Sequence, residues 1–69
     1  MLKLKLEKLL EEKSLTRYWL SQETEISYPT IDRYYKNKTS IYDNYILNAI
    51  CNALDCQPAD LFEYQKDEK

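Results

Sequence analysis

Residues 27–36, SYPTIDRYYK, combine apolar and polar side chains in a pattern that predicts a helix with one free polar side. Ile31 and Tyr34 are spaced to face a core. The side that they leave free holds Tyr28, Thr30, Asp32, Arg33 and Lys36. An arginine fork can pair with both acceptors on a guanine edge, and hydroxyl and amino groups bind phosphates. These residue types either form hydrogen bonds and charge pairs with double-stranded DNA or only keep one face of the helix hydrated.

The segments around this helix predict how it is held. Thr16 is placed to cap a helix over about 17–23, and Ser27 is placed to cap the next, which carries Pro29 in its first turn and ends near Lys36. Asn37 suits a left-handed helix end. Asp43 is placed to cap a fourth helix over 44–54, and a short fifth helix follows from Pro58 and carries Leu61 and Phe62.

The amino-terminal segment supports two interpretations. Leu6, Leu9 and Leu10 follow helical spacing and predict a first helix over about 4–13. The stretch Leu2–Leu6 also alternates apolar and polar residues, which is typical of an extended arm. Residues 65–69, QKDEK, are expected to form a tail.

Length and composition favour one small helical domain over residues 1–64. The chain has 69 residues, 43% of them hydrophobic, and contains no Gly and only two Pro, which disfavours a turn-rich β fold. We therefore expect an all-α domain of five helices. There is no apolar run of about 20 residues for a membrane span, and the lysines interrupt the first ten residues too often for a signal sequence. A cytoplasmic protein is expected.

Charge and cysteine content restrict the classes of function. The net charge is −2, but residues 13–38 carry five basic and three acidic side chains, whereas residues 39–69 carry two basic and six acidic ones. Binding of DNA depends on the field at the docking face more than on the total charge. Cys51 and Cys56 cannot complete a zinc site alone, so we expect reduced thiols and no metal or other cofactor. With no His, no nucleophile beside a base and no Gly-rich phosphate loop, an enzyme is not expected.

The capped pair of helices and the carboxyl-terminal segment together resemble the Cro/repressor-type helix-turn-helix family (the lambda repressor-like fold, XRE family). The resemblance covers residues 5–64. In the two-helix unit it is carried by Leu20, Ser21, Glu25, Ile26, Ser27, Thr30 and Ile31. In the ending LDCQPADLFEY it is carried by Leu54, Cys56, Pro58, Asp60, Leu61 and Phe62.

Three positions depart from the family pattern. Glu25 stands where the family usually has Gly, which adds strain if φ is positive and brings a carboxylate near DNA. Ser21 replaces the Ala that lets the two helices approach closely. Arg17 stands near the start of the second helix, where the family often has Gln, and can still reach a phosphate.

The resemblance implies that the third helix lies in the major groove. The residues then expected at base edges are Tyr28, Pro29, Asp32 and Arg33. Arg33 is the strongest candidate, whereas Asp32 either accepts from cytosine or holds Arg33 in place. The residues then expected at phosphates are Thr16, Arg17, Ser27, Thr30, Lys36 and Lys38.

The leading hypothesis is a phage-like or bacterial transcriptional regulator, most simply a repressor, that binds a palindromic operator as a homodimer formed in solution or on DNA. The dimer would use the fourth and fifth helices, with Tyr42, Tyr45, Phe62 and Tyr64, or exchange the arm through Leu2 and Leu4. No small-molecule effector is expected. The alternative is a protein-interaction module of the same fold, an antitoxin or anti-regulator subunit, with weak or no DNA binding.

Overall fold

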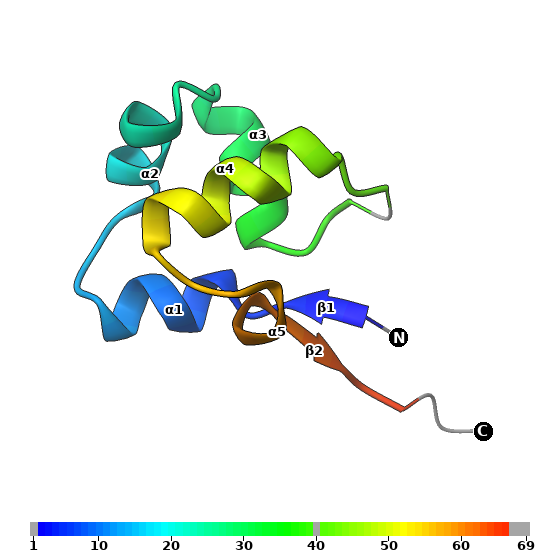
Figure 1. Ribbon diagram of the computed structural model, residues 1–69. Helices are drawn as coiled ribbons and strands as arrows, with labels where there is room; N and C mark the ends of the chain where they lie inside the picture. Colours follow the sequence, from blue (N-terminus) through cyan, green and yellow to red (C-terminus); the bar gives the residue numbers. More distant parts are fainter. Residues whose placement is uncertain (1, 40, 67–69) are drawn as a thin grey trace.

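Five helices follow one another along the chain, and a short strand lies before the first and after the last (Figure 1). The computed structural model describes residues 2–39 and 41–66. The elements are β1 (Leu2–Leu4), α1 (Leu6–Glu12), α2 (Arg17–Thr24), α3 (Tyr28–Tyr35), α4 (Asn44–Leu54), α5 (Pro58–Leu61) and β2 (Phe62–Tyr64). The predicted five-helix domain is confirmed, and a two-stranded sheet adds to it. Of the expected tail, residues 67–69 lie outside the described part of the chain.

The sheet settles the two interpretations of the amino-terminal segment in favour of the extended arm. β1 and β2 pair antiparallel, with Leu2 opposite Tyr64 and Leu4 opposite Phe62. The first helix therefore begins at Leu6, and the expectation that it starts near residue 4 was wrong. Phe62 likewise belongs to a strand, because the chain leaves α5 in an extended conformation at that residue. The alternation of Leu and Lys suits a strand, since it places Leu2 and Leu4 on one face and Lys3 on the other, and Leu4 is buried there.

Asn37 connects the arm to the end of α3. Its side-chain oxygen accepts from the amide of Leu4 at 2.8 Å, and its side-chain nitrogen donates to the carbonyl of Leu4 at 3.1 Å. The amide thus pairs with the outer edge of β1 as another strand would. Because Asn37 directly follows the C-cap of α3, the arm and this helix are held to each other.

One core lies between the helices and the sheet. Its buried members are Leu4, Leu6, Leu10, Leu20, Ile31, Tyr34, Ile50, Leu54 and Leu61. Every helix and β1 contribute to it, so the two-helix unit is held by burial against the rest of the chain. Burying one such side chain is worth about 1.5–3 kcal/mol.

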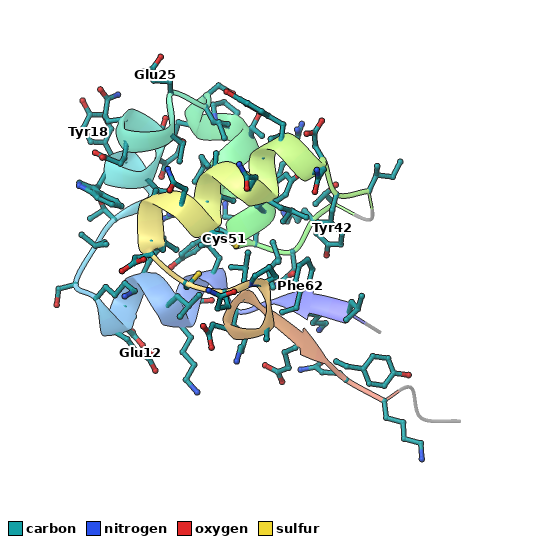
Figure 2. All side chains as sticks on the ribbon, in the orientation of Figure 1. Glu12, Tyr18, Glu25, Tyr42, Cys51 and Phe62 are labelled. Carbon is teal, nitrogen blue, oxygen red and sulfur yellow. The ribbon has the colours of Figure 1, made fainter. Side chains whose placement is uncertain are left out.

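Aromatic rings cover the end of the core near the sheet. Tyr42 makes edge-on contacts with Tyr34 and Phe62, with ring centroids 5.8 and 5.6 Å apart (Figure 2). The hydroxyl of Tyr34 accepts from the amide of Asp43 at 2.9 Å. The end of α3 is therefore tied to the start of α4.

Four turns use the left-handed conformation without any glycine. Positive φ angles occur at Ser14, Glu25, Asn37 and Asp55, which follow the last turns of α1, α2, α3 and α4. Asn tolerates this conformation, as predicted for Asn37, but a Glu there costs about 1–2 kcal/mol relative to glycine.

Candidate nucleic-acid interface

The turn between α2 and α3 is fixed by side chains of α2. Thr16 caps the helix as predicted, its hydroxyl accepting from the amide of Trp19 at 3.0 Å. At the other end Glu25 has φ 60° and ψ 26°, so the strain expected at this position is present. Ser21, only 8% exposed, donates to the carbonyl of Ile26 at 2.6 Å. The Ser that replaces the usual Ala therefore adds a hydrogen bond across the turn.

The start of α3 differs in one detail from the prediction. Ser27 occupies the N-cap position, and Pro29 lies in the first turn as expected, but the Ser27 side chain makes no capping bond to the backbone. Its hydroxyl instead shares a hydrogen bond of 2.9 Å with the hydroxyl of Thr30. Both hydroxyls lie at the first turn of α3, where they remain available to a phosphate.

The two sides of α3 separate as predicted. Ile31 and Tyr34 are 0% and 3% exposed and face the core, whereas Tyr28, Pro29 and Arg33 are exposed. Arg33 makes no side-chain hydrogen bond or ion pair within residues 2–39 and 41–66. The guanidinium of Arg33, the strongest candidate for base readout, therefore has no partner in the described part of the chain.

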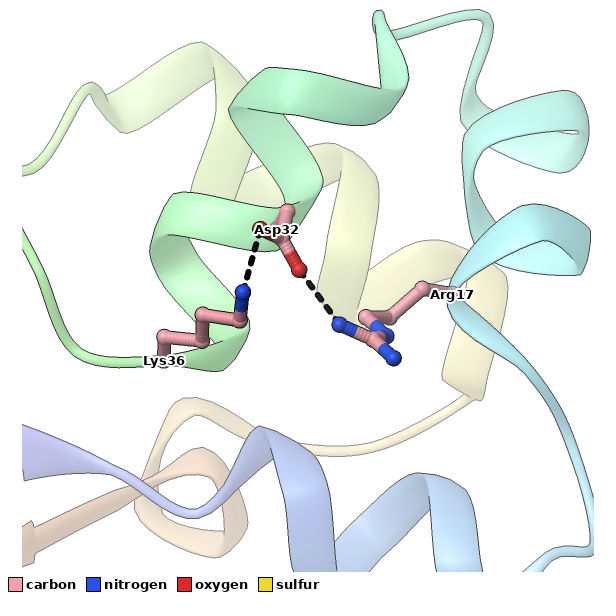
Figure 3. Close-up of polar contacts among 3 residues, drawn as sticks. All are labelled: Arg17, Asp32 and Lys36. Atoms are coloured by element: carbon pink, nitrogen blue, oxygen red, sulfur yellow. Dashed lines mark hydrogen bonds and ion pairs between the residues drawn. The ribbon is translucent and has the colours of Figure 1, made fainter.

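Asp32 lies between two cations from different helices (Figure 3). Its Oδ1 accepts from Nη1 of Arg17, at the start of α2, at 2.5 Å, and its Oδ2 pairs with Nζ of Lys36, one turn along α3, at 3.1 Å. The three side chains are partly exposed, with 24% for Asp32, 32% for Arg17 and 48% for Lys36. We call this set the Asp32 cluster.

Two tyrosines hold Arg17 in this cluster. Its guanidinium carbon lies 4.3 Å from the ring centre of Tyr35 and 5.8 Å from that of Tyr28, which are cation–π distances. The hydrogen bond to Asp32 raises the pKa of Arg17 above its ordinary value. In turn, the hydrogen bond from Lys36, with a second from Arg17, holds the pKa of Asp32 below its ordinary value. Arg17 and Asp32 are therefore both charged at neutral pH.

The Asp32 cluster corrects one part of the prediction. Asp32 was expected to accept from cytosine or to hold Arg33 in place, and the second role is wrong because its two oxygens pair with Arg17 and Lys36. Neighbours at i and i+1 on a helix point in different directions, which is the physical reason. Residue spacing alone offered no signal for the pair Arg17 and Asp32, which are 15 positions apart.

The residues predicted for phosphates lie along both helices of the unit. Arg17 starts α2, Ser27 and Thr30 open α3, and Lys36 and Lys38 follow its end. Lys36 and Lys38 are exposed, as is Thr16, whereas Arg17 and Thr30 are half-buried. The sequence did not single out Tyr35 as a supporting residue, although its place three positions after Asp32 puts both on one side of the helix.

The two cysteines lie in and just after α4, away from the residues of α2 and α3 described above. Cys51 and Cys56 are free thiols, both half-buried. Burial, together with the neighbouring Cys51, raises the pKa of Cys56 to about 11, so its thiolate is scarce at neutral pH. In the described residues no three His, Cys, Asp or Glu side chains gather into a set that could hold a metal ion. No helix there has the length and apolar content to cross a membrane.

Comparison with known proteins identifies the family to which this two-helix unit belongs. The family model of the Cro/C1-type HTH DNA-binding domain matches residues 5–67. No match was found among curated proteins. Among solved structures, the chain is similar to the crystal structure of a "putative DNA-binding protein" from Bacteroides fragilis. The TM-score is 0.80 and the identity is 27%, with 91% of this chain and 100% of that chain covered. The two-helix unit and the family match together show that the chain belongs to the Cro/C1-type helix-turn-helix DNA-binding family.

Proposed function

We propose that this protein is a transcriptional regulator that binds a palindromic operator by placing α3 in the major groove. The observation that carries the proposal is the separation of the two sides of α3, which buries Ile31 and Tyr34 and leaves Tyr28, Pro29 and Arg33 exposed. In this motif the N-terminal part of the second helix meets base edges, while the first helix crosses the phosphate backbone. Such a role implies a compartment that holds DNA, the cytoplasm of a bacterial cell or of a phage-infected host.

Arg33 is the proposed principal reader. Its exposed fork is free to pair with O6 and N7 of a guanine, and Tyr28 and Pro29 offer apolar contact to a thymine methyl group. Phosphate contacts are proposed for Thr16, Arg17, Ser27, Thr30, Lys36 and Lys38. For Asp32, the ion pairs with Arg17 and Lys36 support a role other than base contact.

A second copy is proposed to dock on α4 and the adjoining part of α5. The eleven residues of α4, NYILNAICNAL, include no charged side chain, although 32% of the chain is charged. Depletion of charge with an exposed aromatic residue is typical of the core of a protein interface, and Tyr45 is 72% exposed. Beside it, α4 and α5 border an open hollow of about 450 Å³, whose lining includes Leu47, Pro58 and Phe62 together with the three asparagines of α4 and Asp55.

The asparagines on α4 are self-complementary under two-fold symmetry. Asn44, Asn48 and Asn52 recur every four residues on one side of the helix, and all are exposed. If two copies of α4 pack antiparallel about Asn48, Asn44 of one copy lies opposite Asn52 of the other. An amide both donates and accepts hydrogen bonds, so each pair can be satisfied. Exchange of the arm has less support, because Leu4 is 5% exposed within its own chain and β1 pairs with its own β2.

Selection from pooled random duplex DNA at two salt concentrations, alongside Arg33→Ala, tests the proposal. We expect enrichment of a palindrome whose half-sites lie about one helical turn, roughly 10 base pairs, apart. Enrichment should weaken with salt and be lost in the variant. Failure to enrich any sequence at low salt would reject the DNA role and favour the interaction module, for which partner capture would be the next experiment.

A further inference from the structure

The Asp32 cluster places one carboxylate between two of the cations proposed to contact phosphates. Arg17 keeps four of its five N–H donors outside the bond to Asp32, and Lys36 keeps two of its three. Both side chains are partly exposed, so these donors can reach an approaching anion. The cluster is therefore a site that can still bind a phosphate, but with one of its two positive charges cancelled.

A DNA phosphate would meet Asp32 at close range. To contact both Arg17 and Lys36, it must lie near a carboxylate of the same sign or displace it from those two cations. Either event opposes binding, and it does so for every DNA sequence, because phosphates are common to all. The two tyrosines that hold Arg17 keep its guanidinium beside Asp32 in the free protein. The carboxylate is therefore already in place when a phosphate approaches.

We propose that Asp32 is an internal counter-anion that lowers the affinity of this domain for all duplex DNA by competing with phosphates for Arg17 and Lys36. This inference rests on the proposed function, since it concerns the same surface. Weak binding by a single domain makes occupancy depend on two domains engaging an operator together. Asp32 thereby limits retention on non-specific DNA.

The test is Asp32→Asn, which keeps the shape and a hydrogen-bond acceptor for Arg17 while removing the charge. Binding to a duplex of random sequence is measured by fluorescence anisotropy from 50 to 400 mM salt. Asp32 cancels one positive charge, and each added cation contributes about 0.9 to the slope of log K against log salt, so we expect the slope to steepen by about 1. Affinity at 0.1 M salt should rise about tenfold, if the two curves converge near 1 M.

Glu23→Gln is the matched control. Glu23 lies on α2, is exposed and pairs with no cation among the residues described, so its loss removes one carboxylate from the same unit without freeing a cation. We expect less than about a twofold gain in affinity. Adding Arg17→Gln and Lys36→Gln to the Asp32 variant should return the slope to the wild-type value or below. The amide spectrum of each variant verifies that the fold is retained.

The outcomes separate the inference from the proposed function. If the wild type binds in a salt-dependent manner and the Asp32 variant binds equally or more weakly, the inference is wrong and the DNA role stands. Loss of preference at one base pair without general tightening would instead assign Asp32 to base readout, and would also overturn the inference. If neither protein binds duplex DNA at low salt, both the inference and the proposed function fail.

Discussion

The solvent-facing sides of α3 and α4 differ in charge. The side of α3 and its flanks carries Arg17, Asp32, Arg33, Lys36 and Lys38, whereas α4 exposes three asparagines and one tyrosine with no charge. Charged groups on a helix normally remain hydrated, and their contacts weaken with salt. An uncharged face with an aromatic residue gains most from burial against another protein surface.

This difference predicts two kinds of binding with opposite responses to salt. Contacts made by α3 should weaken steeply as salt rises, since they replace counterions on DNA. Contacts made by α4 should be nearly independent of salt, since they bury neutral surface. Each side can therefore be disrupted separately.

Asn48→Lys should abolish the dimer. It places like charges opposite each other across the proposed two-fold axis, at a cost of several kcal/mol. We expect a monomer in sedimentation analysis and operator affinity at least about 100-fold weaker. The added positive charge favours contact with DNA, so a loss of affinity cannot come from repulsion between the protein and DNA. Asn48→Gln is the control, and an unchanged dimer in the Lys variant would remove α4 from the interface.

Arg33→Ala should remove sequence preference while sparing the dimer. A bidentate contact to guanine is worth about 1–3 kcal/mol, so operator affinity should fall roughly 5- to 150-fold. Arg33→Lys keeps the charge but not the fork, and should restore non-specific binding without the preference. Competition between operator and random duplex measures the change. If the preference survives in both variants, another residue of α3 is the reader.

Glu25→Gly should stabilise the protein by relieving the left-handed conformation at the turn before α3. The gain expected is about 1 kcal/mol, after allowing for the greater freedom of glycine in the unfolded chain. For a domain of this size the melting temperature should rise by about 4–8 °C. Glu25→Gln removes the charge but keeps the strain, so it should improve DNA binding without raising the melting temperature. Equal melting temperatures for all three proteins would show that φ at this turn costs nothing.

Lower pH should remove the contribution of the Asp32 cluster to folding. The pKa of Asp32 is held below its ordinary value of 3.8, so its stabilising effect is complete above that value. The effect is lost as pH falls through the folded pKa. The stability gap between wild type and Asp32→Asn in urea unfolding should therefore be constant from pH 7 to 5 and should shrink below pH 4. A gap that grows on acidification would contradict this sign.

Local chemistry made most of the helical framework predictable. Thr16 and Asp43 predicted the starts of two helices because their side-chain oxygens can accept hydrogen bonds from the backbone amides of the first turn. Both capping bonds are present. Asn37 was expected at a left-handed helix end because its short polar side chain tolerates positive φ. Ile31 and Tyr34 were correctly placed in the core by helical spacing.

The features that were missed depend on residues distant in the chain. Strand β2 forms beside β1, and its alternating residues Phe62, Glu63 and Tyr64 are too few to predict a strand by themselves. Asn37 holds the arm across 33 positions, and Asp32 meets Arg17 across 15. The first contact follows from the arm lying beside the end of α3, and the second follows from the packing of α2 against α3. Residue spacing within one helix reveals neither.

An amide NMR titration of the ¹⁵N-labelled protein with a duplex of random sequence at low salt tests both binding surfaces at once. We expect salt-reversible shifts at Arg17 and across residues 27–38, while the exposed residues of α4 respond to protein concentration instead. Shifts concentrated on α4, or none at any DNA concentration, would contradict the assignment of α3 to DNA and α4 to a second copy.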